Sequence, residues 1–221
     1  MSIGAIILLA VGALVYFGIA DRILDRLYLN DKMALVIIAA IIAGSFFDLT
    51  LSQSPLITIN VGGAIIPVLL AAYVLSRADS AREWIRTIIA ILLTGAAIYG
   101  ISILFSDFGH GRDIIDPMYI YAIVGGLIAY ILGRSRKGSY IAGTLGFLFY
   151  NLINVWRVLS GQINSQVMIG GAGAFDNIVI AGIFAVLLAE LIGESRERIQ
   201  GGPVKGNNLP GENRGDNNDE N

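Results

Sequence analysis

The chain is a series of long apolar runs separated by short polar segments. A helix needs about 20 consecutive apolar residues to cross the hydrocarbon core of a bilayer, and seven runs approach this length. They cover residues 2–20, 33–51, 57–75, 87–106, 117–133, 139–158 and 166–192. The pattern therefore predicts an all-α polytopic membrane protein with seven transmembrane helices. The first run lacks a positively charged start, so we expect a retained helix and not a cleaved signal peptide.

Positive charge alternates between the gaps that separate these runs. The gaps at 21–32, 76–86 and 134–138, together with the tail, hold 13 of the 15 Lys and Arg residues. The positive-inside rule assigns the charge-rich side to the cytoplasm. We therefore expect the N-terminus outside, the C-terminus inside, and the lipid bilayer as the first partner of the chain.

Two regions of different composition follow from this pattern. Residues 1–193 are predicted to form the transmembrane domain, in which Glu190 lies near the cytoplasmic end and is expected to reach water. Residues 194–221 are rich in Gly, Asn and charged side chains. Such a segment cannot bury a core, so we expect a disordered polar tail in the cytoplasm.

Composition agrees with a membrane protein and excludes several functions. Charged residues make up 14% of the chain, against roughly a quarter in soluble domains. The net charge of −2 and the lack of a basic domain argue against a nucleic-acid partner. The absence of Cys excludes disulfides and thiolate chemistry. The only histidine, His110, lies between Asp107 and Asp113 in a short loop, where a solvated segment is favoured over a metal site, and we expect neither metal nor cofactor.

Glycine pairs recur near the predicted outer ends of three runs, at 62–63, 125–126 and 170–171. Such pairs let helices approach closely, or let the backbone unwind beside a cavity. The pairs of runs 33–51/57–75 and 139–158/166–192 also resemble one another, since each has an aromatic-polar end, a short loop and a Gly-Gly-Ala element. This likeness suggests parallel three-helix repeats joined by the run at 87–106.

Pro67 is predicted to kink the run at 57–75.

Polar side chains inside the predicted spans map to the outer half of the bundle. Asp176, about ten residues into the last run, is the most informative, since a buried carboxylate is protonated or paired. Asp48 lies nearer the outer surface, and the two runs that carry these aspartates are antiparallel. Two carboxylates in one site can activate a water, one as base and one as acid. We therefore take Asp48 and Asp176 as candidate catalytic residues, with a candidate substrate-binding set of Asn60, Gly62, Gly63, Asn151, Asn154, Gly170, Gly171, Gly173 and Asn177. The alternative is that each aspartate only hydrogen-bonds neighbouring helices, with Asn60, Asn151, Asn154 and Arg157 as available partners.

The segment 170–184, GGAGAFDNIVIAGIF, resembles the second-aspartate motif of GxGD intramembrane aspartyl proteases, the group of presenilins, signal peptide peptidases and prepilin peptidases. In both, an aspartate follows a Gly-rich turn and precedes an apolar helix. Asp48 followed by Pro55 resembles the first-aspartate segment of prepilin peptidases. Gly173 occupies the first Gly position of the motif, whereas Phe175 stands at the second. The resemblance implies a membrane-embedded aspartyl peptidase that cleaves a membrane peptide.

The whole chain also resembles uncharacterised prokaryotic membrane proteins that are grouped only by a domain of unknown function. The resemblance rests on Phe47-Asp48, on Asn60 with the Gly62-Gly63 pair, and on the element GGAGAFD that ends at Asp176. It implies a multi-pass protein of a prokaryotic cytoplasmic membrane and no particular activity.

Three functions therefore remain open. The first is an intramembrane aspartyl hydrolase, and the second is a transporter of a small solute, a cation or protons, with Asp176 as the binding group. The third is a non-catalytic membrane scaffold in which the glycine pairs bind partner helices. The sequence does not determine the substrate or the oligomeric state.

Overall fold

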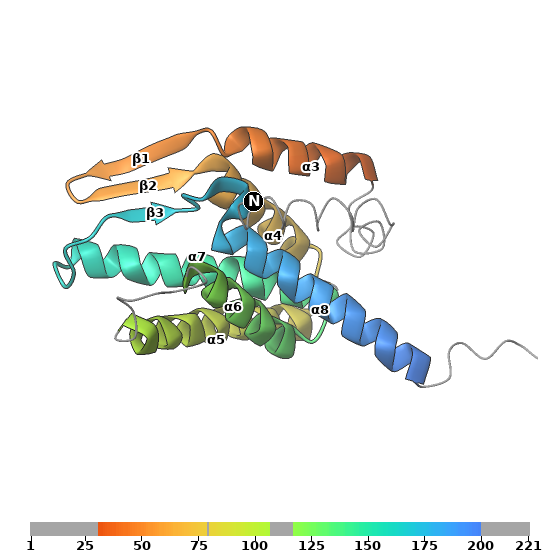
Figure 1. The fold of residues 1–221 in the computed structure, drawn as a ribbon. Helices are drawn as coiled ribbons and strands as arrows, with labels where there is room; N and C mark the ends of the chain where they lie inside the picture. Colours follow the sequence, from red (N-terminus) through yellow and green to blue (C-terminus); the bar gives the residue numbers. More distant parts are fainter. Residues whose placement is uncertain (1–30, 79, 107–116, 200–221) are drawn as a thin grey trace, which may run out of the picture.

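The computed structural model describes residues 31–78, 80–106 and 117–199 (Figure 1). The predicted first span, the loop with His110 and the tail from residue 200 lie outside these ranges. Helices make up most of the described chain. They are α3 (Asp31–Gly44), α4 (Ile66–Ser76), α5 (Ala81–Ser106), α6 (Pro117–Gly133), α7 (Arg136–Leu159) and α8 (Asn177–Ile199).

Three of the predicted spans coincide with single helices. α5 contains the predicted run 87–106, α6 has the same bounds as the run 117–133, and α7 contains the run 139–158. These runs contain no proline beyond the first turn, so the backbone can keep its hydrogen-bond ladder throughout. α8 continues past the predicted domain boundary at residue 193 and ends at Ile199.

The prediction of an all-α fold missed a small sheet. Its strands occupy parts of the predicted spans 33–51, 57–75 and 166–192. β1 (Asp48–Gln53) and β2 (Leu56–Asn60) form an antiparallel hairpin, and β3 (Val167–Ile169) pairs in parallel with β2. The sheet order is β1-β2-β3. The β-branched residues of β2 favour extended backbone. A short apolar run of this kind cannot be told from a helix by periodicity alone, which explains the error.

Two irregular helical turns connect the strands to the helices. The π-helical turn η1 (Val61–Ile65) joins β2 to α4, and the 3₁₀ turn η2 (Gly173–Phe175) lies between β3 and α8. Pro67 lies in the first turn of α4. The prediction of a continuous helix at 57–75 is wrong, because its first residues form β2 and the helical segment begins at η1. The kink at Pro67 stays a prediction.

The core of the bundle is centred on α7, which packs against α4, α5, α6 and α8 (Figure 1). A layer of small residues lies where these helices approach, formed by Ala90, Ala129, Ala142 and Ala185. Small side chains let the helix backbones approach closely. The sheet lies at one end of the bundle, beside the C-terminal part of α7.

Helix length and composition identify α5 as able to cross a membrane, over Ala81–Leu104. Three shorter apolar helical segments accompany it within the described residues, at Val61–Ser76, Ile120–Gly133 and Asn177–Gly193. The mostly helical, apolar character of the bundle agrees with the sequence analysis. The number of spans and their orientation stay predictions.

Candidate functional site

Three chain segments meet where the sheet joins the helices. Their backbones come into direct contact because glycine, which has no side chain, occupies the contact positions. We call residues 44–48, 60–64 and 170–176 together the glycine junction. A Cβ atom on Gly63 would overlap the carbonyl oxygen of Gly170 and lie 2.7 Å from that of Gly173. Gly170 and Gly173 have φ angles of 72° and 60°, which L side chains rarely adopt. The backbones can therefore approach only with glycine at these positions.

Asn60 forms the polar centre of the junction. Its side-chain amide donates to the carbonyl oxygen of Ser45 at 2.9 Å and to Oδ1 of Asp48 at 2.8 Å. Its side-chain oxygen accepts a bond of 2.8 Å from the backbone N–H of Gly63. Asn60 is 1% exposed, so its side chain lies away from bulk solvent and its bond with Gly63 is buried. It caps η1 and fixes the direction of the Asp48 carboxylate.

Ser45 links α3 to the turn before α8, a role that the sequence analysis missed. Its hydroxyl donates to the carbonyl oxygen of Ile41 at 2.7 Å and accepts from the backbone N–H of Ala174 at 2.8 Å. A serine beside Gly44 inside an apolar run is the signal that could have identified it. Its partner at 174 is far away in sequence and could not be inferred.

Asp176 lies before α8 and not inside a helix, which corrects its predicted position ten residues into a span. Its Oδ1 accepts from the backbone N–H of Ile178 at 3.0 Å, and its Oδ2 accepts from that of Ala172 at 3.3 Å. The carboxylate therefore caps the N-terminus of α8. Asp176 is 7% exposed. The positive end of the helix dipole and the two amides offset only part of the cost of burying this carboxylate in its charged form.

The two aspartates belong to one hydrogen-bonded arrangement. Asp48 bonds to Asn60, Asn60 bonds to the backbone of Ser45, and the Ser45 hydroxyl bonds to the turn that carries Asp176. Asp48 is exposed at the start of β1, whereas Asp176 is buried. The junction thus contains one accessible and one enclosed carboxylate, both oriented by fixed donors.

The other predicted site residues are distributed around the junction and along α7. Gly62 is buried within η1, and Gly171 is exposed in the turn between Gly170 and η2. Asn151 donates from its side chain to the carbonyl oxygen of Phe147 at 3.1 Å within α7. Asn154 is half-buried on the same helix. The side-chain oxygen of Asn177, the residue after Asp176, is buried and has no hydrogen-bond partner within the described ranges.

A second polar group lies at the opposite end of α8. Glu190 is 7% exposed and forms an ion pair with Arg136 at the start of α7. The expectation that Glu190 reaches water is therefore wrong, because α7 covers it. The hydroxyls of Thr94 and Ser139 are buried in the bundle and have no hydrogen-bond partner among the described residues.

The donor set of the junction suits polar organic groups better than a metal. Within the described ranges, no three His, Cys, Asp or Glu side chains gather in a metal-binding group. Two carboxylates, the Asn60 amide, the Ser45 hydroxyl and several backbone N–H groups can instead bind a peptide bond, a water or a small cation.

The chain belongs to the family "Protein of unknown function (DUF1614)", which matches residues 26–188. This range includes the whole glycine junction and ends within α8. Neither the curated proteins nor the solved structures contain a match to this chain.

Proposed function

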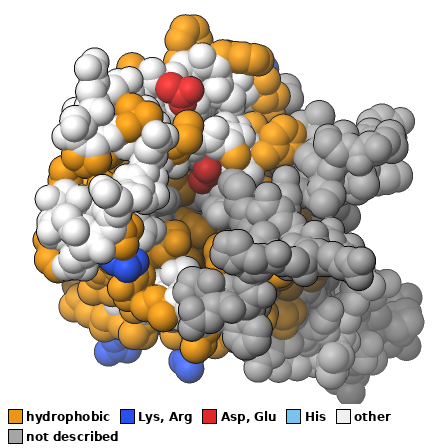
Figure 2. Space-filling view, turned by 60° about the vertical axis from the view of Figure 1, so that its left-hand side comes forward, with side chains coloured by type: hydrophobic (Ala, Val, Ile, Leu, Met, Phe, Trp, Pro, Cys, Tyr) orange, Lys and Arg blue, Asp and Glu red, His pale blue; other side chains and the backbone are white. Residues whose placement is uncertain are grey.

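We propose that this DUF1614 family member is a multi-pass protein of the cytoplasmic membrane of a prokaryote, with the glycine junction on the outer side. Large apolar side chains are exposed on every described α-helix, which a water-facing surface does not favour. They include Val36, Leu69, Ile89, Leu127, Leu152 and Ile183. Figure 2 shows that on one face the charged side chains form only small separate patches among hydrophobic and uncharged surface.

The positions of the basic residues support this orientation. Arg82 and Arg86 at the start of α5 lie with Arg134 after α6 around one cavity, and Arg136 begins α7. These residues belong to the charge-rich gaps that the positive-inside rule assigns to the cytoplasm. Trp84 and Trp156 are 48% and 62% exposed, as expected of anchors at a membrane interface.

We further propose that the junction hydrolyses peptides, with Asp48 and Asp176 as the catalytic pair. The observation that carries this proposal is the bonded arrangement of Asp48, Asn60, Ser45 and the Asp176 turn. In such a reaction the ionised carboxylate takes a proton from the attacking water, and the second aspartate, as the protonated carboxylic acid, donates its proton to the carbonyl oxygen of the peptide.

The sheet offers a place for an extended peptide. β1 is an edge strand, so its outer backbone groups face no neighbouring strand of the sheet. Leu49 and Leu51 on this strand are 49% and 63% exposed. A peptide that pairs with β1 gains backbone hydrogen bonds, and its chain then passes Asp48 at the start of the strand. The hydrolase proposal therefore includes an extended substrate.

The test compares two substitutions of Asp176 in full-length protein in lipid nanodiscs. Through its single carbonyl oxygen, Asn can still accept the bond from the N–H of Ile178 and keep the helix cap, and it loses only the longer bond from Ala172, whereas Ala removes both. Cleavage of a defined peptide library is followed by mass spectrometry. We expect Asp176→Asn to lower cleavage by at least about 100-fold, the size of one acid–base contribution, with little change in thermal stability.

Three results would count against a catalytic pair. Full cleavage by Asp176→Asn would leave Asp176 as a structural cap. Equal cleavage by Asp48→Asn and the unsubstituted protein would remove Asp48 from the reaction. An unsubstituted protein that cleaves no library peptide would exclude the peptidase and favour a scaffold or a transporter.

A transporter is the second candidate, because two helices begin with irregular turns that lie against each other at the glycine junction. η1 precedes α4 and η2 precedes α8, and these turns contact each other. Interrupted helices that meet near a carboxylate are the usual binding architecture of secondary transporters. Proteoliposomes with an internal pH dye test this function. Proton or cation flux that is lost in Asp176→Asn supports it, and flux equal to that of protein-free liposomes excludes it for the ions tested.

A further inference from the structure

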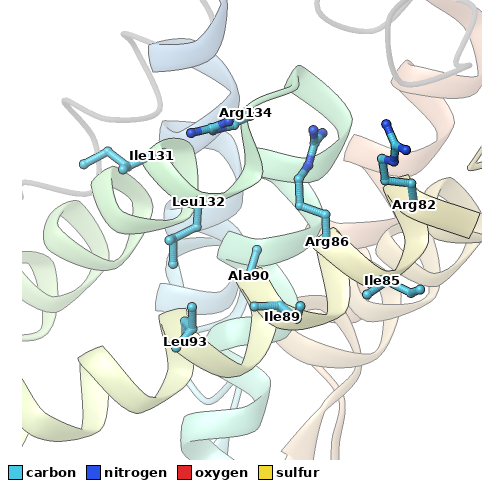
Figure 3. Close-up of a pocket in the computed structure, with 9 residues that line it drawn as sticks. All are labelled: Arg82, Ile85, Arg86, Ile89, Ala90, Leu93, Ile131, Leu132 and Arg134. Atoms are coloured by element: carbon cyan, nitrogen blue, oxygen red, sulfur yellow. The ribbon is translucent and has the colours of Figure 1, made fainter.

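A cavity between α5 and α6, away from the glycine junction, has three arginines at its rim (Figure 3). Its volume is about 760 Å³. Arg82 and Arg86 project side by side from the first turns of α5, and Arg134 comes from the end of α6 (Figure 3). We call this cavity with its rim the arginine pocket.

The walls of the pocket beyond the arginines are apolar. Ile89 and Leu93 of α5 and Ile131 of α6 are between 50% and 58% exposed. Figure 3 shows these side chains along the two helices, with the guanidinium groups gathered toward one end. An occupant that fits must therefore have an anionic end and an apolar end.

Arg86 supplies a donor that the described protein leaves unused. Its Nε is buried and has no hydrogen-bond partner. An unsatisfied buried donor destabilises the folded chain, and more strongly when the group is charged. A phosphate oxygen is a suitable acceptor, because guanidinium groups bind phosphate through paired, charge-assisted hydrogen bonds.

Arg134 occupies a backbone position that normally favours glycine. Its φ of 55° is left-handed, and its N–H bonds to the carbonyl oxygen of Tyr130 at 3.3 Å, which ends α6. Glycine is the usual residue at such a helix end. An arginine at this position places a positive charge over the pocket at a conformational cost.

We propose that the arginine pocket binds one anionic phospholipid, with its phosphate at Arg82, Arg86 and Arg134 and an acyl chain along Ile89, Leu93 and Ile131. Basic pockets between membrane helices on the cytoplasmic side are known to bind lipid head groups. The inference depends on the membrane placement proposed above and not on the chemistry of the junction, so a failed peptidase assay leaves it intact.

The experiment measures lipid binding to the full-length protein in a mild non-ionic detergent. Native mass spectrometry counts bound lipid, and the unfolding temperature is measured in parallel. Phosphatidylglycerol is the anionic probe and phosphatidylcholine is the zwitterionic probe. We expect a single phosphatidylglycerol to be retained, with a rise in unfolding temperature, and weaker retention of phosphatidylcholine. Inorganic phosphate, which lacks the acyl chain, is expected to give no comparable rise.

Arg134→Gly is the most informative variant, because glycine suits the left-handed backbone and should preserve the fold. We expect its affinity for phosphatidylglycerol to fall about tenfold, the loss that corresponds to one charge-assisted hydrogen bond. Arg86→Gln should have a similar effect. Lys32→Gln is the matched control, since it removes one exposed positive charge outside the pocket.

Three outcomes would overturn the proposal. Equal retention of phosphatidylglycerol and phosphatidylcholine would show that the arginines do not select an anion. An equal effect of Lys32→Gln and Arg134→Gly would show a general response to net charge. A thermal shift with inorganic phosphate as large as that with the lipid would show a simple anion site without a role for the apolar walls.

Discussion

The glycine junction and the arginine pocket differ in whether the protein itself supplies hydrogen-bond partners for their polar groups. At the glycine junction, Asp48, Asn60 and Asp176 receive their hydrogen bonds from the protein itself. At the arginine pocket, the buried Nε of Arg86 has no partner in the part of the chain that the structure describes, and Arg134 is exposed. The first arrangement is preorganised and rigid, whereas the second is complete only when a ligand is bound. Substitutions at the junction should therefore affect the fold strongly, and substitutions at the pocket should affect binding.

The largest effect is expected for Gly63→Ala. The added methyl group would overlap the carbonyl oxygen of Gly170, and backbone on both sides leaves little room to adjust. We expect a loss of about 3 kcal/mol in the free energy of unfolding, measured by denaturation in detergent. The control is Gly100→Ala in α5, where a new Cβ has no neighbour within 4 Å. A similar loss in both variants would contradict the close approach at the junction.

Asn60→Ala should be the next most damaging change, because it removes three hydrogen bonds. It also leaves the buried N–H of Gly63 unsatisfied, and we expect a cost of about 2–3 kcal/mol.

Asn60→Asp sharpens this comparison through its pH dependence. A carboxylate at position 60 can accept from Gly63 but cannot donate to Asp48, and the two negative charges repel. Protonation of one carboxyl restores a donor, so the folded state binds a proton more readily than the unfolded state. Stability should therefore rise as the pH falls, relative to the unsubstituted protein. A pH-independent difference in unfolding temperature between the two proteins would exclude direct contact between positions 48 and 60.

Ser45→Ala should have an intermediate effect. The variant loses the bond from the N–H of Ala174 to the serine hydroxyl, a contact between α3 and the turn before α8. One such bond contributes about 1 kcal/mol. Hydrogen exchange at the amide of Ala174 checks the cause. Exchange that is no faster than in the unsubstituted protein would show that Ser45 does not hold the turn.

The smallest effect on stability is expected at the arginine pocket. Arg134→Gly relieves about 1 kcal/mol of left-handed strain but increases the entropy of the unfolded chain. The unfolding free energy in lipid-free detergent should therefore change by less than about 1 kcal/mol. A large loss would mean that Arg134 stabilises the bundle directly, and the contrast between the junction and the pocket would no longer hold.

The sequence by itself determined the apolar helices and the division of polar from apolar segments. α5, α6 and α7 could be predicted because a long apolar run without internal proline has few alternatives to a helix. The same reasoning failed at Asn60, where β2 ends, and at Asp176, which precedes α8. Short apolar segments next to glycine pairs are compatible with both strand and helix, and pairing with a distant strand decides between them.

Only the tertiary structure decided what the polar residues contact. The sequence singled out Asp48, Asn60 and Asp176, but not Ser45, whose bond to Ala174 spans 129 positions. It also did not reveal that the ends of α5 and α6 bring Arg82, Arg86 and Arg134 to one cavity. Hydrogen bonds and charge clusters depend on distances in space. The pattern of apolar and polar residues along a chain indicates only which residues share one face of a helix or strand.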